Sequence, residues 1–254
     1  MNPPRSLFRY EPITLQSLRN LKDQVIHLGS PRRFNDPYDC AFGAALGDLT
    51  DGDLARLLDG VKVNATDETL KLMFKENARK TLSELTEKFL DNRGVSCFTE
   101  SNENLLMWSH YADGGRGMCL EFSTQEALFE KAKKVTYADS IPVVNLGAIL
   151  CDHEYERIAD LYRTKSNHWQ YEAEWRVIHE TVGTNWVYEA KSLLGVYFGP
   201  NAPDDLLEIV CLILGGQNDS VRFYKGTRSE TDFKVEFRQI NYISHLEALR
   251  AGLK

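Results

Sequence analysis

The chain has 254 residues, of which 43% are hydrophobic and 26% are charged, and these proportions are ordinary for a globular protein. Its formal net charge of −7 argues against a dedicated nucleic-acid binder, because such proteins hold the phosphate backbone with a basic surface. No apolar run approaches the roughly 18 residues of a membrane-spanning helix, and residues 1–6 contain no apolar signal core. We therefore expect a cytoplasmic protein without membrane contact, organised as a single domain over residues 1–254.

Five cysteines are scattered along the sequence, and none belongs to a Cys-x-x-Cys pair. We interpret them as small buried hydrophobic residues of a reducing compartment, and we predict no metal site. They are Cys40, Cys97, Cys119, Cys151 and Cys211.

The first thirty residues predict a strand, a helix and a second strand. Residues 7–10 and 25–28 form short runs typical of strands, and the second run stops at a Gly-Ser-Pro sequence. Between them, Thr14 is a suitable N-cap for a helix whose leucines recur at helical spacing. The opening segment is therefore expected to form a compact unit.

The following loop, residues 31–39, is dense in turn formers and polar side chains. Asn35 and Asp36 can bond back to their own backbone, and the proline after Asp36 favours an extended residue before it. The loop is therefore expected to be rigid. It is either a structural corner or a loop that presents Arg32, Arg33, Asn35 and Asp36 as part of a site.

Residues 48–93 differ in character from their surroundings, since leucine and phenylalanine recur at helical spacing between many charges. This pattern predicts two amphipathic helices. We interpret the segment as a helical insertion on one side of the core.

The middle of the chain predicts strands at 95–98 and 118–122 with a helix over about 101–112 between them. Trp108 and Tyr111 lie three residues apart, so they share a face of that helix. His110 lies beside them and is either a packed residue or a candidate base.

The remaining elements complete an α+β pattern. We expect a helix over about 143–163, further strands at 134–137, 194–198, 220–224 and 233–240, and helices over about 204–214 and from 244 onward. Seven or eight short strands mixed with helices, without a regular βαβ order, predict a bent or split mixed sheet.

The stretch 169–178 reads as a strand, because aromatic and β-branched residues alternate with polar ones. Glu172, Glu174 and Arg176 fall on one face of this predicted strand, opposite an apolar set that includes Trp175 and Val177. Two carboxylates and a guanidinium in a row are either a solvated surface or part of a site, because buried charges must be paired.

Several common motifs are absent from the sequence. It contains no phosphate-binding P-loop, no Gly-x-Gly-x-x-Gly after a strand, no His-Glu-x-x-His and no Gly-x-Ser-x-Gly. Kinase, dinucleotide dehydrogenase, zinc hydrolase and α/β-hydrolase interpretations are therefore set aside.

Three distinctive blocks follow one another in the sequence. They are Phe34-Asn35-Asp36-Pro37, Met107-Trp108-Ser109-His110-Tyr111 and Glu172-Ala173-Glu174-Trp175-Arg176. In this order they resemble the bacterial family catalogued as domain of unknown function 2971, and the resemblance covers about residues 7–198. That family has no settled chemistry, and the resemblance implies an association with defence or mobile-element genes.

The order of Arg9, Ser30 and the pair Glu172 and Glu174 also resembles ADP-ribosyltransferases of the Arg-Ser-Glu type. That resemblance implies a split sheet that binds NAD, with Glu174 supporting the positive charge that develops at the nicotinamide ribose. It further implies that Glu172 orients the acceptor and that Arg9 holds the pyrophosphate. An aromatic residue, Phe34 or Trp108, would stack on the nicotinamide.

Three functional hypotheses follow. The first is an NAD-dependent ADP-ribosyltransferase-like or NAD-cleaving enzyme that acts as an accessory of bacterial defence, with NAD as its nucleotide ligand. The second is a non-catalytic sensor or interaction module, in which Glu172, Glu174 and Arg176 form an internal network and a protein is the partner. The third is a metal-dependent nuclease that uses Asp36, Asp39 and the two glutamates.

For the first hypothesis the catalytic residues are Glu174 and Glu172, and the ligand-binding residues are Arg9, Tyr10, Ser30, Phe34, Asn35, Asp36, Trp108, His110, Tyr111 and Arg176.

Overall fold

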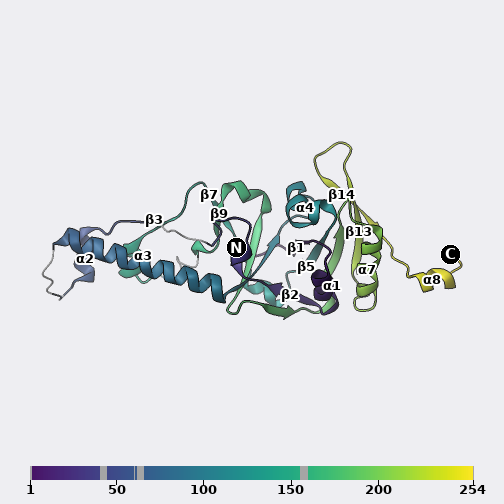
Figure 1. The fold of residues 1–254 in the computed structure, drawn as a ribbon, viewed down its shortest axis with the longest axis horizontal. Coiled ribbons are helices and arrows are strands. Elements are labelled where there is room, and N and C mark those ends of the chain that lie inside the picture. The colour runs from purple at the N-terminus through teal and green to yellow at the C-terminus, as the bar shows by residue number, and fades with distance from the viewer. Residues whose placement is uncertain (1, 41–44, 60, 62–65, 155–159, 254) are drawn as a thin grey trace.

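A mixed sheet is the framework of the molecule (Figure 1). The computed structural model describes residues 2–40, 45–59, 61, 66–154 and 160–253. In spatial order the eight strands of this sheet are β14 (Val235–Ile240), β13 (Arg222–Arg228), β12 (Leu193–Phe198), β5 (Met118–Ser123), β1 (Ser6–Glu11), β4 (Gly94–Thr99), β10 (Glu174–His179) and β6 (Lys133–Lys134). Neighbouring strands are antiparallel except β12 and β13, which are parallel. The predicted α+β class with a mixed sheet is confirmed.

Further strands pair outside this sheet. The two-stranded pairs are β2 (Val25–Leu28) with β11 (Thr184–Val187), β3 (Ala45–Leu46) with β8 (Val143–Val144), and β7 (Thr136–Ala138) with β9 (Thr164–Ser166). A single bridge between Gly29 and Val95 connects the end of β2 to β4. The loop after β2 is thereby placed beside the main sheet.

In the part of the chain that the structure describes, α3 is the longest helix. The α-helices are α1 (Leu15–Lys22), α2 (Asp51–Leu57), α3 (Asp67–Asn92), α4 (Leu105–Tyr111), α5 (Leu146–Leu150), α7 (Asp204–Gly215) and α8 (His245–Arg250). The 3-10 helices are η1 (Pro31–Arg33), η2 (Asp113–Gly115), η3 (Ala127–Lys131), η4 (Asn167–Glu172) and η5 (Ala190–Ser192). Within the described ranges, none of the helices has the length and apolar character needed to span a membrane.

The predicted N-cap of α1 is confirmed. The Thr14 side chain accepts a hydrogen bond from the backbone N–H of Ser17, and the Ser17 hydroxyl accepts one from the N–H of Thr14. This reciprocal capping box fixes the start of the helix. Leu21 is then buried against the main core, whereas Leu15 is exposed.

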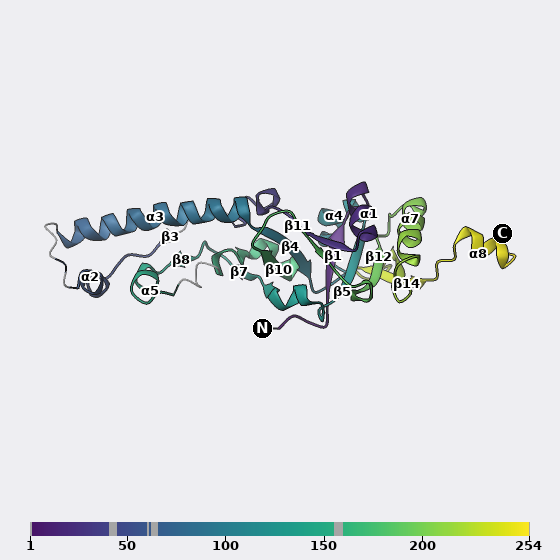
Figure 2. The same cartoon turned by 90° about the horizontal axis from the view of Figure 1, so that it is seen from below.

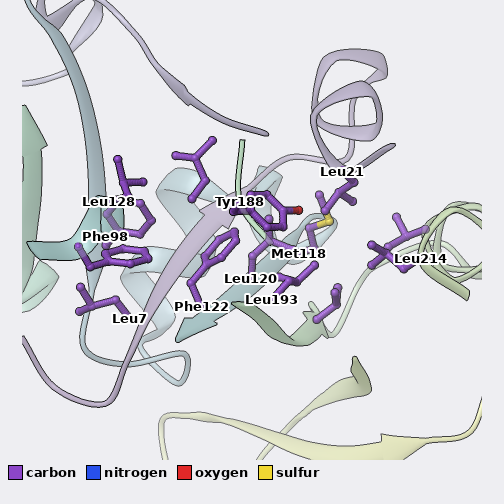
Figure 3. Packing of buried hydrophobic residues seen from close by; sticks show 14 of the residues in the cluster. Leu7, Leu21, Phe98, Met118, Leu120, Phe122, Leu128, Tyr188, Leu193 and Leu214 are labelled. Carbon is purple, nitrogen blue, oxygen red and sulfur yellow. The ribbon is translucent and has the colours of Figure 1, made fainter. Parts of the chain in front are cut away.

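The main hydrophobic core lies along the sheet, between it and the helices α1 and α7 (Figure 3). Phe122 on β5 is at its centre and makes edge-on ring contacts with Phe98 on β4 and with Tyr188. Leu7 and Trp175 are almost fully buried in the same cluster. On β5, Met118, Leu120 and Phe122 belong to this core and Cys119 belongs to another buried cluster, so alternate residues face opposite sides of the sheet.

The helical insertion extends from one end of the sheet as a long arm, and α8 lies at the opposite end (Figures 1 and 2). The two helices predicted within 48–93 are confirmed as α2 and α3, with residues 60 and 62–65 outside the described part of the chain. The arm has its own buried cluster, in which Leu82 of α3 meets Leu146 and Ile149 of α5. It is therefore stabilised by a core separate from that of the sheet.

The long helix predicted over 143–163 is wrong. The segment begins as strand β8, continues as the five-residue helix α5, and has a left-handed residue at His153 with φ of 57°. A left-handed residue ends a right-handed helix, which the apolar spacing of the segment does not reveal. Residues 155–159 of this prediction lie outside the described residues.

Candidate functional site

A pocket of about 380 Å³ opens beside β1 and β4, under the loop that follows β2. Residues of α4 and η4 close its other side. The volume lies within the range of roughly 300–1,000 Å³ that is typical of small-molecule sites. The predicted site residues on its wall are Arg9, Tyr10, Ser30, Phe34, Asn35, Tyr111, Glu172 and Glu174.

Arg176 on β10 is buried behind this wall and holds two carboxylates. Its Nη1 and Nη2 atoms donate to Asp39 over 2.7 and 2.6 Å, and its Nε and Nη2 atoms donate to Glu174 over 2.7 and 3.0 Å. Nη1 also donates to the backbone carbonyl of Tyr162. Charge-assisted, two-point contacts of this kind are the strongest hydrogen bonds in proteins. The charged face of β10 is thus buried and paired, not a water-facing surface.

Lys165 on β9 is the second buried cation. Its Nζ atom lies 2.5 Å from Glu172, 3.3 Å from Glu174 and 3.6 Å from Asp39. The same ammonium lies 4.8 Å from the centre of the Trp169 ring, within cation–π distance. One lysine therefore connects both glutamates of the Glu-x-Glu motif to the loop at Asp39.

Glu172 completes the set from the pocket side. One of its carboxylate oxygens accepts from Lys165, and the other accepts from the Tyr111 hydroxyl over 2.5 Å. The Asn35 side-chain amide donates to the same tyrosine oxygen over 3.1 Å. Asn35 of the loop is thus connected to the Glu172 carboxylate of η4 through Tyr111 of α4.

The two glutamates differ in acidity. Burial alone would raise the pKa of Glu174, but the attached Arg176 guanidinium and the Lys165 ammonium lower it to about 2. Burial raises the pKa of Glu172 above its ordinary value, and Lys165 offsets this only in part. Three carboxylates share two cations in this cluster, so the least compensated carboxylate is the one that holds a proton most readily.

The pKa values of the two cations are raised. Burial lowers the pKa of Lys165, but the charges of Glu174 and Glu172 outweigh burial and raise it above its ordinary value. The pKa of Arg176 is affected by the same opposing causes and is also raised. Both side chains therefore stay protonated at neutral pH.

Arginine and histidine side chains also line the pocket. Arg9 has its Nε atom 2.7 Å from Glu11, and its Nη1 atom donates to the Ser96 hydroxyl over 2.9 Å. His27 and the exposed Arg33 are on the wall as well. Their side chains offer N–H groups of the kind that bind phosphate or carboxylate.

The strand predicted over 169–178 is only half confirmed. Residues up to Glu172 form the 3-10 helix η4, and β10 begins at Glu174. Ala173 between them is left-handed with φ of 43°, and the backbone N–H of Glu174 donates to the Tyr137 hydroxyl over 2.8 Å. This bend turns the Glu172 side chain toward Lys165 and Tyr111, which a continuous strand over these residues would not do.

Two predicted site residues lie away from the pocket. Trp108 is buried on the other side of α4, where its ring meets Tyr10 edge-on at 4.9 Å and its Nε1 atom donates to the Asn102 carbonyl. Asp36 is buried in the loop, where one of its oxygens accepts from the Tyr38 backbone N–H over 2.9 Å. Both stabilise local structure in this arrangement.

The other two are adjacent to the pocket but not on its wall. His110 is exposed on α4, with its ring near those of Trp169 and Tyr171. Arg176 lies behind Glu174 and contacts the face of Phe34 at 5.3 Å. Its place is therefore to hold the carboxylates of the wall in position.

Sequence reasoning missed Lys165 and assigned Asp39 only to a metal site. Lys165 sits in a short polar run, and lysine is usually exposed, so neither pattern nor composition marks it. The signal that could have indicated Lys165 was the net charge of the strand. Two carboxylates and one guanidinium on a buried strand leave one negative charge, which requires a further cation.

The carboxylates of the nuclease hypothesis surround cations of the chain itself. Asp39, Glu172 and Glu174 contact Lys165, and Asp36 points elsewhere. Among the residues that the structure describes, there is no group of three or more His, Cys, Asp or Glu side chains that could hold a metal ion.

Comparison with known proteins identifies one family. The sequence model of the family described as "Protein of unknown function (DUF2971)" matches residues 107–177, the segment that carries most of α4, Lys165 and the Glu-x-Glu motif. The predicted resemblance to this family is confirmed over those residues. No curated protein and no solved structure matches the chain, and similarity to ADP-ribosyltransferases is not shown.

Proposed function

We propose that the pocket binds an NAD-like nucleotide and that the chain cleaves or transfers its N-glycosidic bond. The proposal is supported above all by the pair of glutamates on the pocket wall, whose environments push their pKa values in opposite directions. Enzymes that react at a sugar carbon commonly use two carboxylates whose pKa values differ.

The pocket lining offers groups that suit such a ligand. Arg9, His27 and Arg33 suit the phosphate groups, and the ring of Phe34 suits a planar base. In this proposal the two glutamates face the sugar. Cleavage of an N-glycosidic bond leaves the electron pair on the departing base and places positive charge on the sugar carbon.

The two glutamates have separate roles in this proposal. Glu174 stays ionised, so its negative charge favours the developing positive charge inside a largely buried site. Glu172 accepts the proton of the attacking hydroxyl, which belongs to water or to an acceptor. Tyr111 and Lys165 hold Glu172 in place, and Arg176 and Lys165 hold Glu174.

The test is release of nicotinamide from NAD by purified protein. We expect Glu172→Gln and Glu174→Gln each to lower the rate by about 100-fold or more, because each removes a charge that acts in the transition state. Glu103→Gln, an exposed glutamate next to α4, is the matched control and should keep the wild-type rate. Equal release by the wild type and by Glu174→Gln, or no release by any of them, contradicts the proposal.

A non-catalytic sensor or interaction module is the second candidate. It is supported by the completeness of the charge network, since Arg176 and Lys165 are satisfied by protein groups without any ligand. Calorimetric titration with NAD, ATP and a short RNA separates the two candidates. Binding of NAD without nicotinamide release favours a sensor, whereas binding with release favours the enzyme.

A further inference from the structure

One residue from each of the three sequence blocks takes part in a single chain of hydrogen bonds. The Asn35 side-chain nitrogen lies 3.1 Å from the Tyr111 hydroxyl oxygen, and that oxygen lies 2.5 Å from Oε1 of Glu172. The members of these two pairs are 76 and 61 positions apart in the sequence, so only the fold brings them together.

The Tyr111 hydroxyl has one proton and two possible acceptors. The first is Oε1 of Glu172 at 2.5 Å, and the second is the Asn35 side-chain oxygen at 3.4 Å. A short hydrogen bond to a carboxylate is stronger than a long one to a neutral amide, so the proton lies toward Glu172. The Asn35 nitrogen can only donate, and its bond makes the tyrosine oxygen an acceptor on the loop side.

The loop fixes the backbone on both sides of Asn35. Phe34 precedes it, and the Phe34 ring lies 5.3 Å from the guanidinium carbon of Arg176. Asp36 follows it, is buried, and accepts a hydrogen bond from the Tyr38 backbone N–H. The Asn35 side chain is exposed, but it extends from an anchored part of the chain.

Helix α4 is connected to η4 at both of its ends. At its start, Asn104 caps the helix with its side-chain oxygen and donates to the Tyr171 carbonyl over 3.0 Å. At its last residue, Tyr111 donates to Glu172, which follows Tyr171 in the sequence. The helix therefore holds the Tyr111 ring between the loop and the Glu172 carboxylate.

The charge on Glu172 depends on its surroundings. Burial and the Glu174 carboxylate raise the pKa of Glu172, whereas the Lys165 ammonium and the hydrogen bond from Tyr111 lower it. Lys165 also contacts Glu174 and Asp39, whereas the single proton of Tyr111 serves Glu172. The titratable groups around the carboxylate are Tyr111 of α4, Lys165 of β9, Glu174 of β10 with Arg176 behind it, Asp39 of the loop, Tyr137 of β7 and Tyr171 of η4.

We propose that Asn35 is a positioning residue that acts through Tyr111. By donating to the tyrosine oxygen, it directs the tyrosine proton to Glu172 and so favours the ionised carboxylate, which is the form that accepts a proton. Hydrogen bonds in a chain of this kind strengthen one another. The use of Glu172 as a base rests on the proposed function, whereas the hydrogen-bond chain and its effect on Glu172 do not.

The test is a pH titration of the Glu172 carboxyl group in the full-length protein without any ligand, followed by carbon-13 NMR. The signal is identified by its absence from the spectrum of Glu172→Gln. We expect Tyr111→Phe to lower the acid dissociation constant of Glu172 by roughly tenfold, because a hydrogen bond to the charged form is lost. Tyr171→Phe is the matched control and should leave the constant unchanged, since Tyr171 is held to α4 through its backbone carbonyl.

Asn35→Asp examines the loop end of the chain. The variant has nearly the same shape, but an accepting carboxylate replaces the donating amide and competes with Glu172 for the tyrosine proton. We expect the acid dissociation constant of Glu172 to fall by roughly tenfold here as well. In the Tyr111→Phe background the same substitution should change the constant by no more than about threefold, because the residue that transmits the effect is missing.

Equal effects of Asn35→Asp in the two backgrounds would overturn the proposal, because the new charge would then act on Glu172 directly through space. An unchanged constant in Tyr111→Phe would overturn it as well. Circular dichroism checks that each variant is folded.

Nicotinamide release is a separate measurement. If the wild type releases nicotinamide, the acidic limb of its pH–rate profile should move to higher pH in Tyr111→Phe and Asn35→Asp and stay in place in Tyr171→Phe. The expected NMR shifts without any release contradict the proposed function but support the positioning role of Asn35.

Discussion

Arg176 joins residues that are far apart in the sequence, Asp39 and Glu174, at a point that water does not reach. Removing charges from water is costly, and their attraction repays this cost only when every partner is present. The network is therefore weak evidence for high stability but strong evidence for a fixed geometry. It holds Glu174 at one position on the pocket wall.

Arg176→Met tests this point. The variant leaves two carboxylates buried without their guanidinium, and we expect the free energy of unfolding to fall by about 3–5 kcal/mol. Urea unfolding followed by circular dichroism measures the change. Arg116→Met is the control, because Arg116 pairs with Asp113 at the surface and should cost no more than about 1 kcal/mol. Similar losses in both variants would contradict the interpretation of the buried network.

The opposite acidities of the glutamates predict opposite pH effects. The pKa of Glu174 in the folded protein is lowered from 4.5 to about 2, so its contribution is present above about pH 4.5 and is lost as the pH falls toward 2. The pKa of Glu172 is raised by burial, so its contribution is lost instead as the pH rises through the folded value.

We therefore expect Glu174→Gln to be less stable than the wild type at pH 7 and to lose that difference as the pH falls from about 4.5 to 2. Glu172→Gln should instead gain on the wild type as the pH rises. Urea unfolding at a series of pH values measures both differences. Parallel pH curves for the two variants and the wild type would show that the glutamates are not perturbed in the folded state.

At the scale of elements, Gly117 and Gly199 lie at the close contact between the end of α4 and the strands β1 and β12. The Gly117 N–H donates to the Ala112 carbonyl at the end of α4, and the Gly199 N–H donates to the Gly117 carbonyl. A Cβ atom on Gly117 would lie 2.3 Å from the Glu11 carbonyl oxygen, so only glycine fits where the chain passes β1. This close approach holds the residue after α4 against β1.

Gly117→Ala should therefore lower the free energy of unfolding by about 1–3 kcal/mol, because the added methyl group forces backbone atoms apart. Thermal or urea unfolding measures the loss. Gly215→Ala at the end of α7 is the control, since no atom lies within 4 Å of the added Cβ and alanine suits a helix better than glycine. A loss in Gly215→Ala as large as that in Gly117→Ala would argue against steric crowding as the cause.

Hydrophobic periodicity and capping residues correctly predicted several strands and helices, because these signals depend only on neighbouring residues. Strands β1, β4, β5 and β12 and helices α1, α3 and α7 appear where periodicity and capping residues place them. The predictions over 169–178 and 143–163 were wrong or incomplete because single left-handed residues, Ala173 and His153, break patterns that otherwise continue. An alanine or histidine in that conformation has no reliable sequence signal.

At the scale of the whole molecule, the pocket is assembled from the first forty residues, from β4 and α4, and from the segment 165–174. Sequence reasoning anticipated that Arg9, Asn35 and Glu174 would converge, because a buried carboxylate needs charged and polar neighbours from elsewhere. It also placed Trp108 there, although the helix turns that ring toward Tyr10. The side toward which a short helix turns is decided by tertiary packing, not by its own spacing.

Helix α3 ends beside the pocket. Near its C-terminal end, the Phe89 ring stacks on that of Tyr162 at 3.8 Å, and Glu87 and Asp91 pair with Arg32 of the loop over 2.6 and 2.7 Å. The Leu90 carbonyl accepts from the Ser30 hydroxyl on the pocket wall. The arm and the wall therefore share one set of contacts.

A helix of 26 residues is a stiff rod about 39 Å long at 1.5 Å per residue. If a force tilts the outer end of α3, its inner end must move against its contacts with Arg32 and Tyr162. The Tyr162 carbonyl also accepts a hydrogen bond from the Arg176 guanidinium. Mechanical strain applied tens of ångströms away would thus arrive at the lining of the cavity.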